Sequence, residues 1–375
     1  MNPVLFPLGI AVGAAHCNRE AERKRLADNV QRGRHTWLSA RRRMGKTSLI
    51  EQVTLDLKRR RRAVVTVSLD LLVVHDAEAL EVRMRQAVSE ATAQLLPKNR
   101  RILDKLKKAF STLKPELVLS DDGVTLKLGS GDSPSETVEA VLKGLDRVAS
   151  ERKRGVMFVC DEFQQLATLK DHTALEGAVR HAAERTKNVA FVFAGSERHL
   201  LAAMFEDPDR PLYRLCERMS LERIGQEHYT SFLMDASRMQ WKKPISGEAI
   251  ERILTLTLRH PYYVNALCGR LWSARRAPSV DDVDAVWALH VEENKRRVAA
   301  RVVELSPAQR AMLAAIARQP TPHPSGQAFL SKVRLPASTG LQAKGVLERE
   351  DLIQQNAAGV WEPVDPVLAA YLREI

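Results

Sequence analysis

The nine residues ARRRMGKTS, from position 40 to position 48, constrain the fold of this chain more than any other stretch. A short apolar run (36–38) precedes them, and apolar residues at helical spacing follow from Ser48. Strand, loop and helix in this order are the setting of a P-loop, where backbone N–H groups and the positive end of the helix dipole face phosphates. The residues expected to bind nucleotide are Ala40, Arg41, Arg42, Arg43, Met44, Gly45, Lys46, Thr47 and Ser48.

Two side chains of this loop carry the expected chemistry. Lys46 would reach the β- and γ-phosphates of ATP, and the hydroxyl of Thr47 would be a ligand of Mg²⁺. One position departs from the usual spacing, because Ala40 stands where the first glycine belongs. Alanine fits there when its φ is negative. A degenerate P-loop with a purely structural role is the alternative that this departure leaves open.

A second segment supports a nucleotide site. Residues 155–160 are continuously apolar, which indicates a strand buried on both faces of a parallel sheet, and Asp161 and Glu162 follow directly. Asp161 would hold Mg²⁺ directly or through water, and Glu162 would polarise the attacking water as a general base. Alone, such a pair often marks an ordinary strand end. Together with the upstream Gly-Lys-Thr it predicts ATP hydrolysis.

Two further catalytic candidates follow along the chain. Ser196 ends another apolar run (189–194) and would sense the γ-phosphate, unless it merely closes the strand at a Gly-Ser turn. Arg210, Arg214 and Arg218 precede a short apolar segment near 219–221. One of them would face the γ-phosphate of a neighbouring subunit as an arginine finger, and Arg214 is our first choice. Surface or intramolecular pairing is an equal alternative for these arginines.

The chain is long enough, at 375 residues, for two or three domains. We expect an α/β ATPase core over 1–225, a small helical lid over 226–300 and a winged helix-turn-helix over 301–375. The core carries an insertion at about 97–132. Within it, alternating apolar residues around Asp122-Gly123 predict a β-hairpin.

The expected winged helix has a candidate recognition helix that presents Ser338, Thr339, Gln342 and Lys344. Residues 301–375 contain eight Lys or Arg and seven Asp or Glu, so this domain is almost neutral. A DNA-reading module usually has a basic surface. The composition therefore favours a packing or protein-contact role for the winged helix over sequence-specific DNA reading.

Positive charge gathers instead in the ATPase half. The formal net charge is +12, and residues 1–62 contain fifteen Lys or Arg against five Asp or Glu. Clustered cations bind the phosphates of duplex DNA without sequence preference, although such a run is as often a solvated face. Few aromatic residues lie among these charges, which disfavours stacking on single strands. The candidates for DNA contact are Arg59, Arg60, Arg61, Arg62, Arg100, Arg101, Lys105 and Lys108.

The four cysteines are scattered and show no metal-ligand spacing, which is typical of reduced thiols. The apolar start, residues 4–15, lacks a basic leader and is too short to span a bilayer. We therefore expect a cytoplasmic protein without a membrane partner.

Several of these motifs together resemble the archaeal-type P-loop ATPases that lie between the AAA+ and STAND classes. The motifs are Asn18-Arg19-Glu20-x-Glu22, Arg42 to Leu49, Asp161-Glu162-Phe163, Ala194-Gly195-Ser196, Pro211-Leu212-Tyr213-Arg214 and His260-Pro261-Tyr262-Tyr263.

The resemblance covers nearly the whole chain and implies a helical lid and a C-terminal winged helix. It further implies that Pro261 and its neighbours contact the base or sugar of the nucleotide. Two positions depart from the family pattern, Ala40 and Arg259, each standing in place of a glycine. The first would weaken phosphate binding and the second would alter the contact of the lid with nucleotide.

Two functions of different classes fit these features. In the first, ATP orders a homo-oligomer whose basic loops grip duplex DNA. In the second, the chain is a STAND-like switch: ATP holds it closed, and a protein partner, acting through the winged helix, opens it without direct DNA binding. The uneven charge favours the first.

Overall fold

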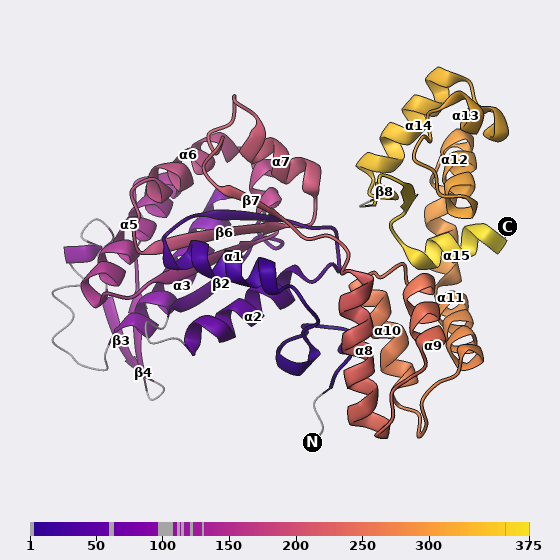
Figure 1. Cartoon of the computed structure of the whole chain (residues 1–375). Helices are drawn as coiled ribbons and strands as arrows, with labels where there is room; N and C mark the ends of the chain where they lie inside the picture. Colours follow the sequence, from indigo (N-terminus) through magenta and orange to yellow (C-terminus); the bar gives the residue numbers. More distant parts are fainter. Residues whose placement is uncertain are drawn as a thin grey trace. The chain divides into compact units, whose positions relative to one another are not determined.

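The computed structural model describes residues 4–59, 64–96, 108–110, 113, 116–120, 123–129, 131–356 and 358–374. The chain divides into two compact units. We call Arg19–Glu222 the P-loop unit, and Met1–Asn18 together with Arg223–Ile375 the C-terminal unit. Figure 1 shows both, coloured along the sequence.

A parallel sheet forms the centre of the P-loop unit. Within the described residues it has five strands in the order β2-β5-β6-β1-β7. The expected apolar runs became these strands: β1 (Thr36–Ser39), β2 (Val65–Asp70), β5 (Val156–Asp161), β6 (Val189–Gly195) and β7 (Glu217–Ser220). The helices of this unit are α1 (Glu20–Gln31), α2 (Lys46–Lys58), α3 (Ala77–Leu95), α5 (Pro134–Arg152), the 3-10 helix η4 (Phe163–Thr168), α6 (His172–Ala183) and α7 (Arg198–Glu206).

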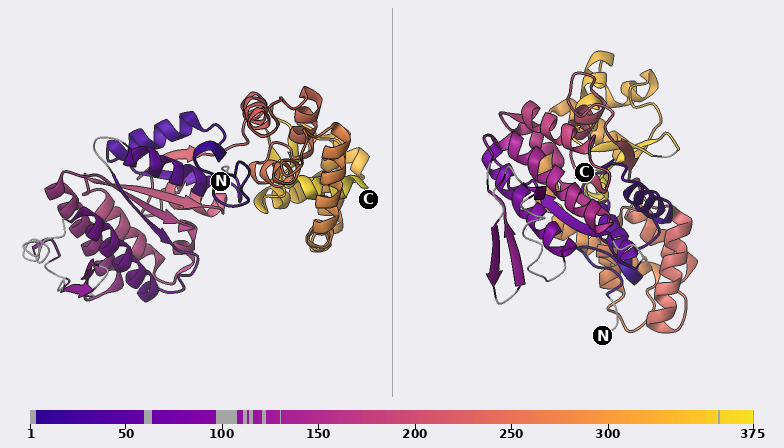
Figure 2. Two further views of the ribbon diagram at one scale, coloured as in Figure 1. Left: turned by 90° about the horizontal axis from the view of Figure 1, so that it is seen from below. Right: turned by 90° about the vertical axis from the view of Figure 1, so that its left-hand side faces the viewer.

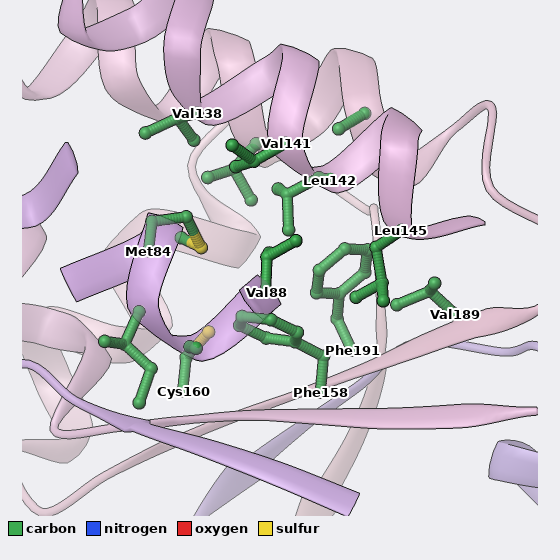
Figure 3. Close-up of a cluster of buried hydrophobic side chains, with 14 of the residues drawn as sticks. Met84, Val88, Val138, Val141, Leu142, Leu145, Phe158, Cys160, Val189 and Phe191 are labelled. Carbon is green, nitrogen blue, oxygen red and sulfur yellow. The ribbon is translucent and has the colours of Figure 1, made fainter. Parts of the chain in front are cut away.

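Helices cover both faces of this sheet (Figure 2). On one face α1 and α2 pack against the strands, with Leu26 and Leu49 fully buried over Val192. On the other face α3 and α5 pack against each other and the sheet. Figure 3 shows Leu142 of α5 pointing toward Phe158 and Phe191 of the two central strands. Burial on both faces explains why β5 and β6 are continuously apolar.

The expected hairpin in the insertion is confirmed. Strands β3 (Glu116–Ser120) and β4 (Gly123–Lys127) pair antiparallel, with Ser120 opposite Gly123. Residues 97–107, which hold several of the basic candidates, lie outside the described residues.

Within the described residues, the C-terminal unit contains the 3-10 helix η1 (Gly13–Ala15) and, from Arg223 on, four helices, a winged helix and a last helix. Three helices and a two-stranded hairpin, in that order, form the winged helix, as the pattern after residue 305 predicts. The elements are α8 (Gln226–Trp241), α9 (Gly247–Leu256), α10 (Pro261–Leu271), α11 (Val280–Val303), α12 (Pro307–Arg318), α13 (Gln327–Val333), α14 (Ala337–Arg349), β8 (Ile353–Gln355), β9 (Trp361–Pro363) and α15 (Pro366–Glu374).

The N-terminal segment differs from the expected division. The sequence places residues 1–18 with the ATPase core, whereas the structure groups them with the C-terminal unit. Phe6 is buried there, with its ring 4.7 Å from that of Trp272 and 5.7 Å from that of Phe232. Asn265 also donates a hydrogen bond to the carbonyl of Pro7 at 2.8 Å. These contacts join segments about 250 positions apart, which local patterns do not reveal.

Among the described residues, no helix combines the length and the apolar character that crossing a membrane requires.

Candidate functional site

The carboxyl ends of the parallel strands bring the sequence motifs of the P-loop unit to one edge. Ser39, the last residue before the P-loop, pairs in register with Gly195, and Asp70 pairs with Asp161. The loop after β1, the acidic pair after β5 and Ser196 after β6 therefore emerge side by side. Ligands bind at this edge in open α/β sheets.

The loop between β1 and α2 contains two residues in the left-handed conformation. Gly45 has φ 89° and caps α2, which starts at Lys46. Arg43 also adopts a left-handed conformation, with φ 62°. Ala40 is not among the residues with positive φ and is 1% exposed, packed in the core formed by α1, α2 and the sheet. The substitution of alanine for the first glycine is therefore accommodated without backbone strain.

Lys46 is buried and turned toward the acidic pair. Its side chain is 9% exposed, and its Nζ lies 3.5 Å from Oε1 of Glu162. Burial lowers the pKa of Lys46, against the opposing effect of Glu162 and Asp161. A largely desolvated cation that makes one long contact among the described residues retains strong affinity for further negative charge, which phosphates would supply.

The carboxylate of Glu162 is held by a set of donors from two segments. Its Oε2 accepts hydrogen bonds from the hydroxyl of Ser196 at 2.8 Å, the Ser196 amide at 3.3 Å and the side-chain amide of Gln164 at 2.6 Å. Desolvation by itself would raise the pKa of Glu162, but these hydrogen bonds and Lys46 outweigh it and lower the pKa. Glu162 is therefore ionised at neutral pH, as a general base must be.

Asp161 ends β5 beside Glu162, and its Oδ1 accepts the Glu162 amide at 3.0 Å. Desolvation is the main cause that raises its pKa, with Glu162 and Asp70 adding to it and Lys46 opposing it. A carboxylate whose pKa is raised in this way is stabilised in its ionised form by a nearby cation. With the exposed hydroxyl of Thr47, it supplies the oxygen donors that Mg²⁺ prefers.

The described residues contain no group of three or more His, Cys, Asp or Glu side chains suited to hold a metal by themselves.

The three candidate arginines have different surroundings. Arg210 is bound by the fully buried carboxylate of Glu176, with Nε 3.2 Å from Oε2. Arg218 pairs with Glu206 at 2.8 Å. Arg214 is exposed, has φ 54° and lies 5.0 Å from the ring centre of Tyr213; among the described residues no carboxylate pairs with it. Of the three, Arg214 is the one whose charge is not engaged by an acid.

The remaining predicted site residues belong to other elements of the two units. Pro261 begins α10 in the C-terminal unit. Arg259, which stands where the resemblance leads one to expect glycine, takes φ 56°, a conformation that glycine adopts more readily than other residues. Arg59 and Lys108 are exposed in the P-loop unit. Outside the described residues lie Arg60, Arg61, Arg62, Arg100, Arg101 and Lys105.

The candidate recognition helix α14 exposes Ser338 and Gln342, while Thr339 is half-buried. Lys344 is engaged within the winged helix, because its Nζ lies 4.0 Å above the ring of Trp361 and 3.0 Å from Glu348. Of the four residues expected to contact DNA on this helix, Lys344 alone is charged, and its charge is thus already paired within the winged helix.

Sequence reasoning missed Gln164. It is 1% exposed and donates to Glu162, yet nothing in the order Asp-Glu-Phe-Gln indicates that the chain turns back on itself there. The turn depends on a left-handed φ of 49° at Glu162, which no residue type in the motif signals.

Comparison with known proteins shows which solved structures have a similar fold. Neither a family model nor a curated protein matches the chain. Among solved structures, a Walker-type ATPase of Pyrococcus abyssi, PABY2304, aligns over 98% of this chain and 99% of its own, at 18% identity and a TM-score of 0.68. The ORC2 protein of Aeropyrum pernix, as its ADPNP-ADP complexes, aligns over 99% and 95%, at 13% identity and a TM-score of 0.57. Its ADP form gives 12% identity, 99% and 97% coverage and a TM-score of 0.53.

These likenesses extend over 98–99% of this chain. They confirm the architecture that the motifs predict. The chain therefore has the AAA+-type P-loop ATPase fold, continued by helices and a C-terminal winged helix.

Proposed function

We propose that this chain binds ATP with Mg²⁺ at the carboxyl edge of its sheet and hydrolyses it. The observation that carries the proposal is the convergence of Lys46, Glu162 and Ser196, from three segments far apart in sequence, into one set of contacts. Two similar folds support it by description: one is called a Walker-type ATPase, and the other was solved with ADPNP and ADP.

Each residue has a distinct part in this reaction. Lys46 and the amides at the start of α2 bind the phosphates and balance the charge that develops on them. Glu162 orients the attacking water and accepts its proton, and Ser196 keeps that carboxylate in place. Mg²⁺, held by Thr47 and Asp161 together with the phosphates, supplies charge neutralisation.

We further propose that ATP promotes a homo-oligomer in which Arg214 acts on the nucleotide of a neighbouring subunit. Its exposure and its lack of a carboxylate partner among the described residues support this role over Arg210 and Arg218. Keeping a non-glycine residue at φ 54° costs about 1 kcal/mol, which favours a function for this side chain.

DNA association is the finer part of the proposal. The excess of basic residues in the first 62 positions and the exposure of Arg59 and Lys108 support sequence-independent binding to duplex DNA. The second candidate, a switch opened by a protein partner, is favoured by the near neutrality of the winged helix and by the engagement of Lys344. Pro261 remains the proposed contact of the C-terminal unit with the nucleotide.

The test measures ATP turnover and particle size together, with and without duplex DNA, at low and high salt. We expect DNA to raise turnover and ATP to drive assembly, with both effects weakening in salt. A slow monomer that ignores DNA would support the switch instead. Lys46→Ala should abolish ATP binding in either case. If that variant binds ATP as tightly as the wild type, the P-loop assignment is wrong.

A further inference from the structure

Gln164 is a buried polar residue whose side chain, among the described residues, makes its hydrogen bond to Glu162. Its side chain is almost fully buried in η4, and its Nε2 donates to Oε2 of Glu162 at 2.6 Å. The orientation of the amide is set by chemistry, because the ionised carboxylate only accepts hydrogen bonds. Its Oε1, by contrast, is buried and accepts no hydrogen bond from the described residues. Burying this unsatisfied oxygen costs free energy, and an apolar side chain of the same size would pack without that cost. Packing alone therefore does not explain a glutamine at this position.

The backbone brings the two side chains together. Glu162 adopts φ 49° as the residue that caps η4, so the chain turns sharply at the end of β5. Two residues later, Gln164 points back at the carboxylate of Glu162, directly after the end of the strand. Left-handed conformations at residues other than glycine, asparagine and aspartate are costly and gather at functional sites.

Gly195 completes the arrangement from the neighbouring strand β6. A Cβ built on Gly195 would lie 2.1 Å from Oε1 of Gln164, far inside van der Waals contact. The absence of a side chain at 195 therefore leaves the space that the Gln164 amide fills. A methyl group there would push the amide away from Glu162.

We propose that Gln164 is a positioning residue for hydrolysis, held against Gly195 so that its amide fixes one oxygen of the Glu162 carboxylate. Gln164 and Ser196 together bind Oε2, and this leaves Oε1, which lies 3.5 Å from Lys46, as the oxygen directed at the phosphate site. Gln164 itself touches neither substrate nor metal and acts through Glu162. The inference rests on the proposed ATPase activity and adds a residue to it.

The first test is Gln164→Leu, which keeps the size of the side chain and removes the donor. Gln165→Leu is the matched control, because Gln165 is the next residue, is half-buried and makes no side-chain hydrogen bond in the described part of the chain. We expect kcat of the Gln164 variant to fall by about 10- to 100-fold while its KM and its affinity for an ATP analogue stay within about threefold. The control should retain wild-type kcat.

The second test exploits the contact with Gly195. Gly195→Ala alone should reduce kcat about as much as Gln164→Ala, since the methyl group displaces the same amide. In the double variant the smaller residue at 164 makes room for the methyl group. Its kcat should equal that of Gln164→Ala, so the two losses are not additive.

The outcomes separate this inference from the proposed function. If the wild type hydrolyses ATP but Gln164→Leu keeps full kcat, or loses affinity and kcat together, Gln164 is not a positioning residue. Losses that add in the double variant would equally contradict the shared contact. If the wild type binds ATP yet shows no turnover that depends on Glu162, the proposed function itself fails.

Discussion

Each unit of the molecule buries an ion pair, and the two pairs differ in how many hydrogen bonds and ionic contacts the cation makes. In the C-terminal unit Arg223 pairs with Glu362 and also donates to the carbonyls of Pro363 at 3.2 Å and Val364 at 2.9 Å. Glu362 accepts further hydrogen bonds from Gln354 at 3.1 Å and from Asn356 at 3.2 Å. In the P-loop unit Glu162 is likewise held by Ser196 and Gln164, but among the described residues Nζ of Lys46 makes one contact, at 3.5 Å to Glu162.

We interpret this difference as one between a structural pair and a pair of the proposed nucleotide site. The charges of a buried pair that is surrounded by hydrogen bonds are compensated within the fold. The Arg223–Glu362 pair therefore stabilises the packing of β9 of the winged helix against the segment that follows β7. The Lys46 pair is long, and its cation has capacity for more negative charge. Incomplete compensation at the carboxyl edge of a sheet is what a phosphate site requires.

The largest effect is expected from Glu162→Gln, which removes the base and keeps the shape of the side chain. Turnover should fall by about 10³-fold, because amides do not accept the proton of water, while ATP binding should persist. Steady-state turnover and equilibrium binding of a fluorescent ATP analogue would show this. Glu90→Gln, on the exposed side of α3, is the control and should behave as wild type. Turnover retained in Glu162→Gln would mean that another residue is the base.

Substitutions of two arginines compare Arg210, which pairs with a carboxylate, with Arg214, which pairs with none among the described residues. Arg214→Ala should lower turnover about 10²-fold at concentrations where subunits assemble, with ATP affinity and thermal stability unchanged. Arg210→Ala should instead lower thermal stability, since it leaves Glu176 buried without its cation. Should Arg214→Ala retain full turnover in the assembled state, the arginine finger must be sought elsewhere.

Arg223→Ala tests the closed pair. Among the described residues, the substitution leaves buried Glu362 with Gln354 and Asn356 as its hydrogen-bond donors. We therefore expect the free energy of unfolding to fall by about 2 kcal/mol, which is less than the loss for a buried charge left without any partner. Four of the five tryptophans lie in the C-terminal unit, so their fluorescence during urea unfolding reports this change. Arg238→Ala, which breaks an exposed pair with Asp235, is the control and should cost under about 1 kcal/mol. ATP affinity should not change in either variant.

The smallest effect concerns the capping box at the start of α11. The Ser279 amide, Arg276 and the Ser279 hydroxyl lower the pKa of Asp282 to about 2, from an ordinary value of 3.8. The folded pKa is the lower one, so this group stabilises the fold above pH 3.8 and loses that effect as pH falls toward 2. Asp282→Asn should melt slightly below wild type at pH 6, as measured by thermal unfolding, with the gap narrowing below pH 3.8 and closing only once the pH falls below about 2. A gap independent of pH would exclude the charge as its cause.

Much of the P-loop unit follows from local pattern. The apolar runs at 155–160 and 189–194 predict buried parallel strands because burial on both faces demands continuous hydrophobicity. Gly-Lys-Thr predicts the helix start and the loop, since the residue types needed there are few. The hairpin around Gly123 follows from turn chemistry in the same way.

Other features depend on contacts that a local pattern does not encode. Phe6 joins the C-terminal unit because an aromatic ring is buried wherever a complementary core lies, whatever the chain separation. Which arginine is bound by an acid is likewise a matter of which strands and helices become neighbours, as the pairing of Arg210 with Glu176 shows.

The sequence by itself determined the class of fold, the identity of the lysine, the two carboxylates and Ser196, and the edge at which they meet, because parallel strands end together. Only the tertiary structure decided that Glu162 is held by Gln164 as well as by Ser196, and that Gly195 leaves room for this. The physical reason is that a left-handed turn and a distance of a few ångströms between strands depend on packing of the whole sheet, whereas residue type and period are properties of the chain alone.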